Sequence, residues 1–591
     1  MARNVYNVDE TLRQEFNFKH LKRLFGYLKP HRKQLIFALF LMLLASAANI
    51  IIPLLVKETI DRVIPERDVQ KLVILCAIFA VLILVSAICL KKRIKVVNEL
   101  GQTIILTMRK DLFVHLQKLP FSFYDDRPHG KIIVRVVNYV NSVSDLLSGS
   151  LVNVLAEGFS LIIVLFIMFF MDPVLTLVCL VAMPIMIFVV FRLKTWNRVA
   201  WQRVSNKSSN LNAYVHESLA GMKVTQSFVR EDYNAQILDD VQDDYRKTWM
   251  RAIRLNNLVT PSIEIISTLA NGAVILVGIA LLEHSVTAGT LIAFLGFTGR
   301  LWSPVINLSN FYNQVITNMA YLERIFETID EDPRIQDAPD AVDLPPIEGE
   351  VEFDHVTFEY EPGMPILEDL SFRVDPGQSI ALVGPTGAGK TTVINLISRF
   401  YDIQKGQIRV DGYDIAKVTL QSLRKQMGVM LQDSFIFSGT IMDNIRYGKL
   451  DATDEEVIEA AKTVCAHEFI MEMERGYQTQ VNERGSRLSV GQRQLISFAR
   501  ALLANPKILI LDEATSSIDT RTEQALQKGL ENLLKGRTSF VIAHRLSTIR
   551  KSDRIMVINH RNIEEAGTHE ELMAKKGHYY TLYTTQTRFI S

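Results

Sequence analysis

The chain has 591 residues, 48% of them hydrophobic, and its 65 basic and 64 acidic side chains give a formal net charge of +1. This length allows several domains, and the balanced charge gives no support to nucleic-acid binding, so no nucleic-acid partner is expected. The four cysteines form neither a C-x-x-C pair nor a His/Cys cluster at metal-ligand spacing, which argues against a zinc-binding class.

The N-terminal segment before the first apolar run is polar and charged. It contains no short apolar stretch followed by a small-residue cleavage site, so no cleaved signal peptide is expected. Residues 18–33 alternate apolar and basic side chains at helical spacing, with apolar residues at Phe18, Leu21, Leu24, Phe25 and Leu28. This pattern predicts an amphipathic helix at the inner membrane surface.

Long apolar runs dominate the first 325 residues and predict membrane-spanning helices. The first, Gln34–Val56, has no charged residue and is long enough for a hydrocarbon core of roughly 30 Å. The last is the most polar, and an alternative with five spans and one buried helix would leave the two chain ends on opposite sides. The expected spans are about 34–56, 72–90, 152–171, 174–193, 263–282 and 286–308.

Charges beside these spans predict their orientation. Basic residues flank the first span at 31–33 and follow the second at 91–95, whereas the short turns at 171–173 and 283–285 hold no Lys or Arg. The positive-inside rule therefore places both termini in the cytoplasm. The first outer loop, 57–71, conflicts with this rule because it holds four basic residues, although four acidic residues accompany them.

The remaining segments define the domain organisation. The inner connections 91–150 and 194–260 are charged and helical in period, which predicts extended helices in the cytoplasm. An Asp- and Pro-rich stretch at 330–348 is typical of a linker. The expected domains are thus a membrane domain at 1–329 and a second domain at 349–591.

The second domain contains a pattern that binds phosphate. An apolar strand at Ser379–Val383 leads into a sequence of the form G-x-x-x-x-G-K-[ST], and apolar residues at helical spacing follow it. Glycines let backbone N–H groups converge on phosphate oxygens at a helix N-terminus, a lysine adds a point charge, and the following hydroxyl suits Mg²⁺. An ordinary Gly-rich turn is the alternative. The residues are Gly384, Pro385, Thr386, Gly387, Ala388, Gly389, Lys390 and Thr391.

Paired carboxylates follow a second apolar strand, Ile508–Leu511. Asp512 suits the hydration shell of Mg²⁺, and Glu513 is placed to orient and deprotonate an attacking water. Paired acids at strand ends are common, so the neighbouring segments matter. A Leu-Ser-Val-Gly-Gln segment lies at 488–492, and Ser516–Asp519 and Val541–Arg545 follow the strand in order.

Together these motifs resemble those of an ABC transporter half-molecule of the exporter type, over essentially the full chain. The resemblance implies an all-α polytopic membrane domain with six helices and long cytoplasmic extensions, followed by an α/β P-loop ATPase domain that uses ATP and Mg²⁺. In the chain's own ATP site, the resemblance implies that Tyr360 stacks on adenine, that Gly384 to Thr392 hold the phosphates, and that His544 assists Glu513. It implies that Gln432 links the metal site to the membrane domain and that Asp519 connects the two ATP sites. The signature residues that it implies close over the partner subunit's ATP are Ser489, Val490, Gly491 and Gln492.

The membrane half carries similar family features. Segments 123–125, with Gly130 and Arg135, and 217–228 resemble the cytoplasmic ends of exporter helices that dock onto the ATPase domains. Segment 479–485 resembles the exporter-specific stretch before the signature, with Glu483 and Arg484 as the expected contacts.

One residue departs from the family pattern. Val490 stands where the commonest family sequence has Gly, and Val cannot adopt the positive φ that is open to Gly. Either Val490 only adjusts the activity of a working site, or this chain contributes a weakened signature to one of two unequal ATP sites. Homodimer and heterodimer both remain open.

The resemblance implies ATP-driven export of hydrophobic or amphipathic compounds by alternating access of a dimer. A lipid flippase or lipid exporter is the nearest alternative, and a regulatory membrane ATPase without net transport is a further one; a peptide exporter is less expected, because no N-terminal protease domain precedes the first span. Ionisable groups within spans mark function, and Glu157 and Glu264 are candidates to attract cationic amphiphiles, the alternative being headgroup or helix contacts. The absence of an organellar transit sequence favours the bacterial inner membrane, in contact with membrane lipids.

Overall fold

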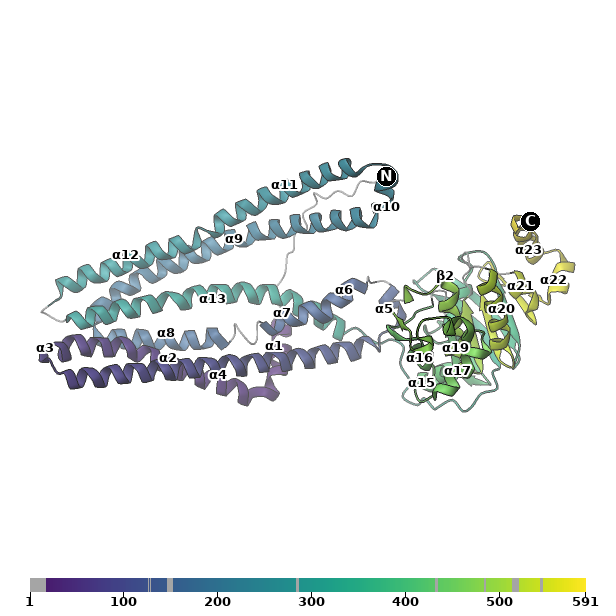
Figure 1. Ribbon diagram of the computed structural model, residues 1–591, viewed down its shortest axis with the longest axis horizontal. Coiled ribbons are helices and arrows are strands. Elements are labelled where there is room, and N and C mark those ends of the chain that lie inside the picture. The colour runs from purple at the N-terminus through teal and green to yellow at the C-terminus, as the bar shows by residue number, and fades with distance from the viewer. Residues whose placement is uncertain are drawn as a thin grey trace. The chain divides into compact units, whose positions relative to one another are not determined.

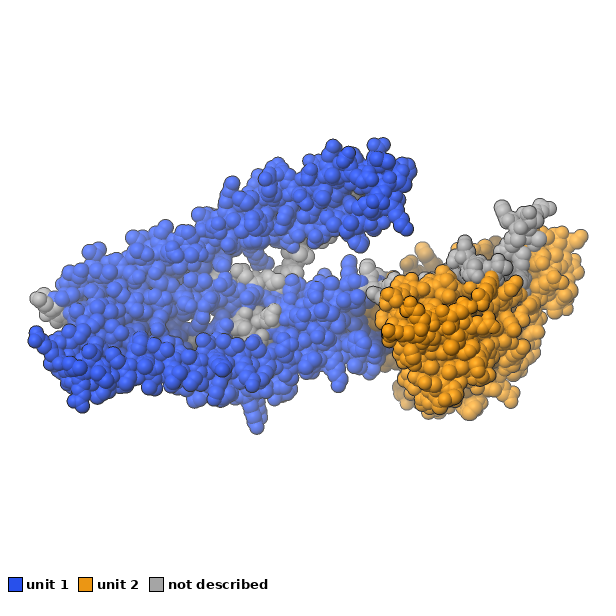
Figure 2. Space-filling model, in the orientation of Figure 1, with its two compact units in different colours: residues 1–118, 127–331 blue, residues 119–126, 332–591 orange. Residues whose placement is uncertain are grey.

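The computed structural model describes residues 18–125, 127, 129–145, 152–282, 286–430, 434–482, 485–512, 520–542 and 546–590. The chain divides into two compact units, coloured blue and orange in Figure 2. Unit 1 comprises Met1–Lys118 and Arg127–Glu331, and unit 2 comprises Leu119–Asp126 and Asp332–Ser591. Each unit has a hydrophobic core of its own.

Unit 1 is all-helical over its described residues (Figure 1). Two π-helical turns, Thr59–Val63 and Arg135–Tyr139, interrupt it. The helices are α1 Phe18–Leu28, α2 Arg32–Glu58, α3 Ile64–Glu66, α4 Val69–Leu116, α6 His129–Val134, α7 Val140–Asp145, α8 Val152–Met171, α9 Pro173–Ala220, α10 Met222–Ser227, α11 Glu231–Asn256, α12 Val259–Ala280 and α13 Ala288–Ile329.

Six helical segments of unit 1 are long and apolar enough to cross a membrane, which confirms the six-helix membrane domain predicted from the sequence. Two of these helices, α4 and α9, have 48 residues each. At 1.5 Å per residue each is about 70 Å long, more than twice a hydrocarbon core of roughly 30 Å. Their charged ends therefore continue beyond the membrane as helix rather than as loop.

Helix α13 lies at the centre of the unit 1 bundle. Its residues Phe294, Phe297 and Leu301 recur at helical spacing and are fully buried. They belong to one core cluster with side chains from α8, α9 and α12, among them Met168, Cys179 and Val274. One side of α13 is thereby fixed against three neighbouring helices.

The turn between α8 and α9 follows from two residues. Asp172 is buried, and its carboxylate accepts the backbone N–H of Leu175 at 2.9 Å. Pro173 occupies the first helical position, where no backbone N–H is needed. An Asp N-cap followed by Pro ends one helix and starts the next within a single residue.

Unit 2 contains two main sheets. A six-stranded sheet has the order β12-β11-β3-β10-β9-β6, and a four-stranded sheet has the order β2-β1-β4-β5. In the six-stranded sheet only the pair β11 and β12 is antiparallel. The strands are β1 Val351–Glu359, β2 Pro365–Val374, β3 Ser379–Val383, β4 Lys405–Val410, β5 Tyr413–Asp414, β6 Met427–Met430, β9 Ile508–Asp512, β10 Thr538–Ile542, β11 Arg554–Asn559 and β12 Asn562–Gly567, and a small pair is formed by β7 Gly439–Thr440 and β8 Gln480–Val481.

Alternating residues of the parallel strands bury both faces of the six-stranded sheet. Leu509 and Val541 belong to one core cluster, whereas Ile508, Ile510 and Phe540 belong to another. Fully buried strands of this kind are typical of parallel sheets covered on both sides, and the predicted α/β fold is confirmed. The helices of unit 2 are α5 Phe121–Asp125, α14 Lys390–Ile397, α15 Leu420–Lys425, α16 Ile441–Arg446, α17 Asp454–Thr463, α18 His467–Met471, α19 Val490–Leu503, α20 Thr520–Leu534, α21 Leu546–Lys551, α22 His569–Lys575 and α23 His578–Ile590.

Candidate functional site

The predicted phosphate loop joins the end of β3 to the start of α14. Gly384 has φ +151°, and a Cβ there would lie 2.2 Å from the carbonyl oxygen of Ile558, so no other residue fits. Gly389 has φ +102° and begins the helix. Gly387 has φ +83° and open space around it, so a ligand can approach the backbone there. The loop thus has the shape of a phosphate cradle at a helix N-terminus.

Lys390 lies folded over this loop. Its ammonium group donates to the carbonyl oxygens of Gly384 at 2.7 Å and Pro385 at 2.9 Å. Burial lowers the pKa of Lys390, although the negative charge of Asp512 acts in the opposite direction. A partly desolvated cation that donates to two carbonyl groups is suited to exchange them for phosphate oxygens.

The two threonines after the lysine lie differently. Thr391 is exposed in the first turn of α14, where its hydroxyl is available to a metal ion. Thr392 is only 4% exposed, and its hydroxyl lies 3.2 Å from that of Tyr360. Thr391 is therefore open to a ligand, whereas the Thr392 hydroxyl contacts the predicted adenine-binding residue.

Tyr360 is 46% exposed beside the loop. Its ring packs edge to face against Phe358 at 4.8 Å and Tyr401 at 5.0 Å between ring centroids. These neighbours hold the ring while part of it stays open to solvent. A half-exposed, held aromatic ring is suited to stacking on a purine.

The carboxyl ends of the parallel strands meet at one edge of the six-stranded sheet. Leu382 of β3 pairs with Ile542 of β10, and Ile542 pairs with Asp512 of β9. Asp512 therefore lies in the same strand row as the residues just before the phosphate loop, which is where nucleotides bind in open α/β sheets. Four predicted residues, Gln432, Glu513, Asp519 and His544, lie outside the described residues, as do Glu483 and Arg484.

The predicted signature forms the start of α19. The Ser489 hydroxyl accepts the backbone N–H of Gln492 at 3.2 Å, and the Gln492 side chain accepts the backbone N–H of Ser489 at 2.9 Å. This reciprocal capping box defines the helix N-terminus. Gly491 is buried in the first turn.

Val490 is the first residue of α19, and its φ is not positive. A Val therefore fits this position without backbone strain. Its side chain is 40% exposed, so it adds apolar bulk at the surface of the helix end. The expected conflict between a Val side chain and a positive φ therefore does not arise at this position.

Segment 119–126 belongs to unit 2, although it follows a helix of unit 1 in the chain. The Tyr401 hydroxyl donates to the Asp125 carboxylate at 2.7 Å, and Phe121 packs on Phe400 with 4.6 Å between ring centroids. The predicted docking residues 123–125 are thus part of α5, whereas Gly130 and Arg135 belong to unit 1. The sequence did not single out Phe400 and Tyr401 for this role.

The two carboxylates predicted within spans lie in different surroundings. Glu157 on α8 accepts the side-chain N–H of Asn307 on α13 at 2.7 Å, and its second oxygen is buried without a partner among the described residues. Glu264 on α12 is exposed.

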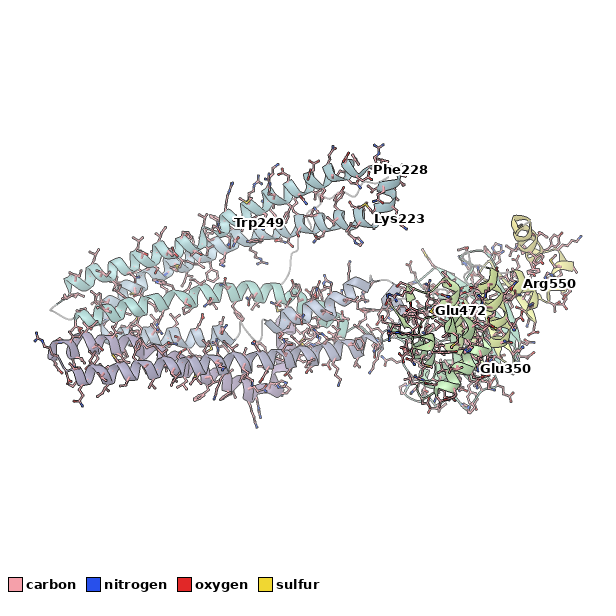
Figure 3. All side chains as sticks on the ribbon, viewed as in Figure 1. Lys223, Phe228, Trp249, Glu350, Glu472 and Arg550 are labelled. Carbon is pink, nitrogen blue, oxygen red and sulfur yellow. The ribbon has the colours of Figure 1, made fainter. Side chains whose placement is uncertain are left out.

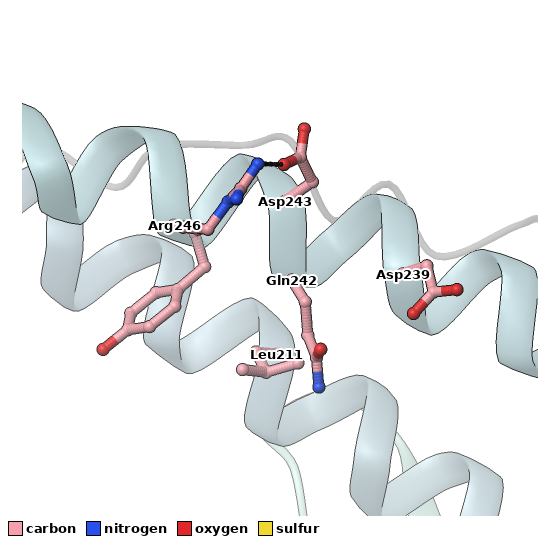
Figure 4. Close-up of a pocket in the computed structure, with 6 residues that line it drawn as sticks. Leu211, Asp239, Gln242, Asp243 and Arg246 are labelled. Carbon is pink, nitrogen blue, oxygen red and sulfur yellow. Dashed lines mark hydrogen bonds and ion pairs between the residues drawn. The ribbon is translucent and has the colours of Figure 1, made fainter.

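Helices α9 and α11 line an open surface hollow of about 420 Å³ (Figure 4). Its lining includes Leu211, Gln242 and Asp243. Asp243 pairs with Arg246 and Lys247, each at 2.6 Å.

Comparison with protein families supports the assignment of both halves. Residues 35–305 match the ABC transporter transmembrane region, and residues 367–516 match the ATP-binding domain family named ABC transporter.

Relatives match along nearly the full chain. The ABC transporter ATP-binding protein YknV of Bacillus subtilis is 43% identical, over 99% of this chain and 98% of the relative. An ATP-dependent lipid A-core flippase of Syntrophus aciditrophicus is 36% identical, over 96% and 94%. The putative multidrug export ATP-binding/permease protein YgaD of Bacillus subtilis is 36% identical, over 96% and 99%.

A solved structure has the same architecture. It is that of a bacterial Atm1-family ABC exporter with ATP bound, which superposes with a TM-score of 0.80 at 29% identity and covers 94% of this chain and 98% of its own. The chain therefore belongs to the ABC transporter family, as an exporter-type half-transporter and multi-pass membrane protein whose ATPase domain binds ATP and couples its hydrolysis to transport.

Proposed function

We propose that this protein exports hydrophobic or amphipathic compounds across the bacterial cell membrane by alternating access of a dimer. The observation that carries the proposal is the joining of six apolar helices to a phosphate loop and a helix-capping signature in one chain. Relatives named for multidrug export and for lipid A-core flipping support an apolar or amphipathic cargo. The lipid flippase is the second candidate.

In the proposed organisation the membrane domain comprises residues 1–329, a linker 330–348, and the ATPase domain 349–591. Basic residues beside the first two spans support cytoplasmic termini. The bacterial origin of the relatives supports a bacterial cell membrane.

The proposed roles in the ATP site follow its geometry. Tyr360 stacks on the adenine, and Gly384 to Thr392 surround the phosphates. Thr391, Gln432 and Asp512 would hold Mg²⁺, which would neutralise developing charge on the phosphate. Glu513 is the base for the attacking water, His544 assists it, and Asp519 links the two sites.

A second copy completes each site in this proposal. Ser489, Val490, Gly491 and Gln492 lie at the N-terminus of α19, where the helix dipole favours a phosphate, and in this family that phosphate is held by the partner subunit. The non-positive φ of Val490 supports a working signature. A homodimer is therefore the simplest assembly, and a heterodimer is the alternative.

Two exposed surfaces support the proposed dimer. At the end of α10, Phe228 is 70% and Val229 is 79% exposed (Figure 3). On unit 2, Phe435, Phe437 and Tyr447 are 53%, 42% and 58% exposed. The Phe437 ring packs edge to face against Phe435 and stacks on Tyr447. Exposed apolar patches mark contact sites, and the α10 end of one copy is proposed to dock on the aromatic patch of the other.

Transport in reconstituted vesicles tests the function. The purified chain in proteoliposomes is expected to move a fluorescent amphiphile when ATP is supplied, and Glu513→Gln is expected to stop both movement and hydrolysis. ATP hydrolysis without movement of any dye or labelled lipid would favour the regulatory ATPase instead.

A further inference from the structure

We propose that helix α1 binds anionic lipid headgroups on its exposed face and thereby holds the last turn of α13 against its buried face. The sequence predicts that this segment lies at the membrane surface, and the structure adds the contacts of its buried face. The inference goes beyond export, because it names a lipid class that regulates the protein whichever compound is transported.

The two faces of α1 differ in burial. Leu24 and Leu28 are buried on one face, where the helix packs on α13 and α4. Lys22, Phe25 and Lys29 are exposed, and residues three, four and seven positions apart lie on the same side of a helix. One side of α1 is thus fixed on protein, and the opposite side is open.

The exposed face combines positive charge with an aromatic ring. Lys22 and Lys29 flank Phe25, which is 43% exposed. Neither lysine has a carboxylate within ion-pair distance in the described part of the chain, and the sequence has no Asp or Glu from Phe18 to Lys57. Such a face suits the boundary of a bilayer, where the ring enters the edge of the lipid tails and the lysines meet anionic headgroups.

The next helix relates this face to the bilayer. Helix α2 is part of the first candidate span, and its side chains Ile36 and Phe40 are 61% and 58% exposed, as expected of residues that face lipid tails. Ile36 follows Lys29 by seven residues, on the order of 10 Å along a helix. The lysines of α1 are therefore close to where headgroups begin, which favours a lipid over a soluble anion.

The buried face holds the end of α13 through Arg23. Its guanidinium group donates to both oxygens of the Asp330 carboxylate, at 2.5 and 2.8 Å, and lies 4.2 Å from the ring centre of Phe326. The His20 ring stacks on the same phenylalanine, with 5.7 Å between ring centroids. The hydrogen bonds from Arg23 hold the pKa of the Asp330 carboxyl below its ordinary value. A paired contact of this kind fixes orientation as well as distance.

The end of α13 depends on partners from outside its last turn. Glu327, Asp330 and Glu331 put negative charge at the C-terminus of this helix, whose last turn has no basic residue. Negative charge there opposes the helix dipole. Arg324 pairs with Glu327, and Arg127 pairs with Glu331, both at 3.1 Å. The partner of the remaining carboxylate, Asp330, comes from α1.

This turn is the covalent link from the sixth span to the ATPase domain, because unit 2 resumes at Asp332. A lipid that binds the exposed face of α1 favours the docked position of that helix. By linkage it also favours the contact of Arg23 with Asp330. The anionic lipid content of the adjoining leaflet then sets how firmly the link is held.

The test uses the full chain in phosphatidylcholine vesicles with increasing amounts of phosphatidylglycerol. Hydrogen exchange is measured for two segments, 18–29 in α1 and 322–331 at the end of α13. A parallel sample in pure phosphatidylcholine receives inorganic phosphate instead, which separates a lipid headgroup from a soluble anion.

The variants address each face of α1 separately. The double variant Lys22→Gln/Lys29→Gln removes the charge of the exposed face, and Arg23→Gln and Asp330→Asn each break the contact on the buried face. The matched control is Lys405→Gln/Lys425→Gln, which removes two exposed lysines of unit 2.

In the wild type, phosphatidylglycerol is expected to slow exchange in both segments, and inorganic phosphate is expected to have no effect. Each lysine near an anionic surface contributes about fivefold to affinity, so Lys22→Gln/Lys29→Gln should lose both responses over the same lipid range. Arg23→Gln and Asp330→Asn should keep the response of α1 and lose that of residues 322–331. The control should respond as the wild type does.

Four outcomes overturn the inference. The first is exchange at residues 322–331 that does not respond to phosphatidylglycerol in the wild type. The second is an undiminished response in Lys22→Gln/Lys29→Gln, and the third is an equal loss in the unit 2 control, which would show a general effect of charge. The fourth is slowing by inorganic phosphate as large as that by the lipid. None of these readouts depends on the cargo, so the export function stands or fails independently.

Discussion

The carboxylate of Asp61 accepts the backbone N–H of Gly289 at 2.8 Å and the hydroxyl of Thr287 at 2.5 Å. Asp61 lies in the π-helical turn that follows α2, and Gly289 lies in the first turn of α13. One side chain of the first span therefore caps the helix of the sixth span. Gly289 has no room for a side chain, because a Cβ would lie 2.6 Å from the Asp61 carboxylate.

Removing this cap should weaken unit 1. Asp61→Ala is expected to cost about 1–2 kcal/mol, since it removes an N-terminal cap and leaves donors unpaired, and Gly289→Ala is expected to cost as much through overpacking. The measurement is the thermal unfolding midpoint in detergent. Glu58→Ala is the control: this residue is paired with Arg62 on the surface, and a drop as large as that of Asp61→Ala would contradict the account.

Within unit 2, the contact of α5 with Phe400 and Tyr401 should transmit the state of the ATPase domain. Phe121→Ala removes the ring that packs on Phe400, and Phe121 is 44% exposed, so stability should change by about 0.5–1 kcal/mol. Basal ATP hydrolysis should persist, while its stimulation by transported amphiphiles should be lost. Tyr401→Phe, which keeps the ring and deletes the hydrogen bond to Asp125, should show a smaller loss. Full stimulation in Phe121→Ala would mean that α5 does not couple the domains.

Lys390 is expected to affect nucleotide binding but not the stability of the ATPase domain without nucleotide. Because burial lowers its pKa, the charged form is disfavoured in the folded protein without nucleotide, and Lys390→Met should not lower the unfolding midpoint. The wild type should gain about 2.7 kcal/mol when ATP is present at a hundred times its Kd. The variant should lose most of this gain, whereas Lys405→Met, an exposed lysine on β4, should retain it. Equal ATP stabilisation in wild type and Lys390→Met would contradict the assigned site.

The substitution Val490→Gly tests whether the signature is weakened. Since the φ of Val490 is not positive, glycine relieves no strain and should leave turnover within about twofold, with at most about 1 kcal/mol lost from helix propensity. Ser489→Ala should instead lower turnover, because it removes both the helix cap and the proposed phosphate contact. A manyfold rise in turnover in Val490→Gly would support a degenerate signature and the heterodimer.

Much of the fold could be predicted because its signals are local. The charge-free run of α2 and the strand before Gly384 need only their own residues to be recognised. The break after α4 also has a local cause, since Pro120 cannot continue a helix. The segment 57–71 was expected to be an outer loop, whereas helix continues through most of it.

Contacts between distant segments could not be predicted from pattern alone. Asn307 and Glu157 are separated by 150 residues, and Tyr401 and Asp125 by 276. Such pairs depend on how the helices pack against each other. The spacing of hydrophobic residues along the sequence does not specify that packing. The contact between Glu157 and Asn307 therefore requires the structure, whereas the phosphate loop is recognisable from its spacing.

The central claim is that a second copy of the chain completes each ATP site. It is tested most directly by measuring ATP hydrolysis and the mass of the particle in the same sample. The chain purified alone in lipid should turn over ATP as a particle of two identical chains, and Glu513→Gln should abolish that turnover while the particle stays dimeric. A monomeric or loosely paired particle with little turnover would contradict the homodimer and point to a partner chain, and undiminished turnover in Glu513→Gln would contradict the assigned base.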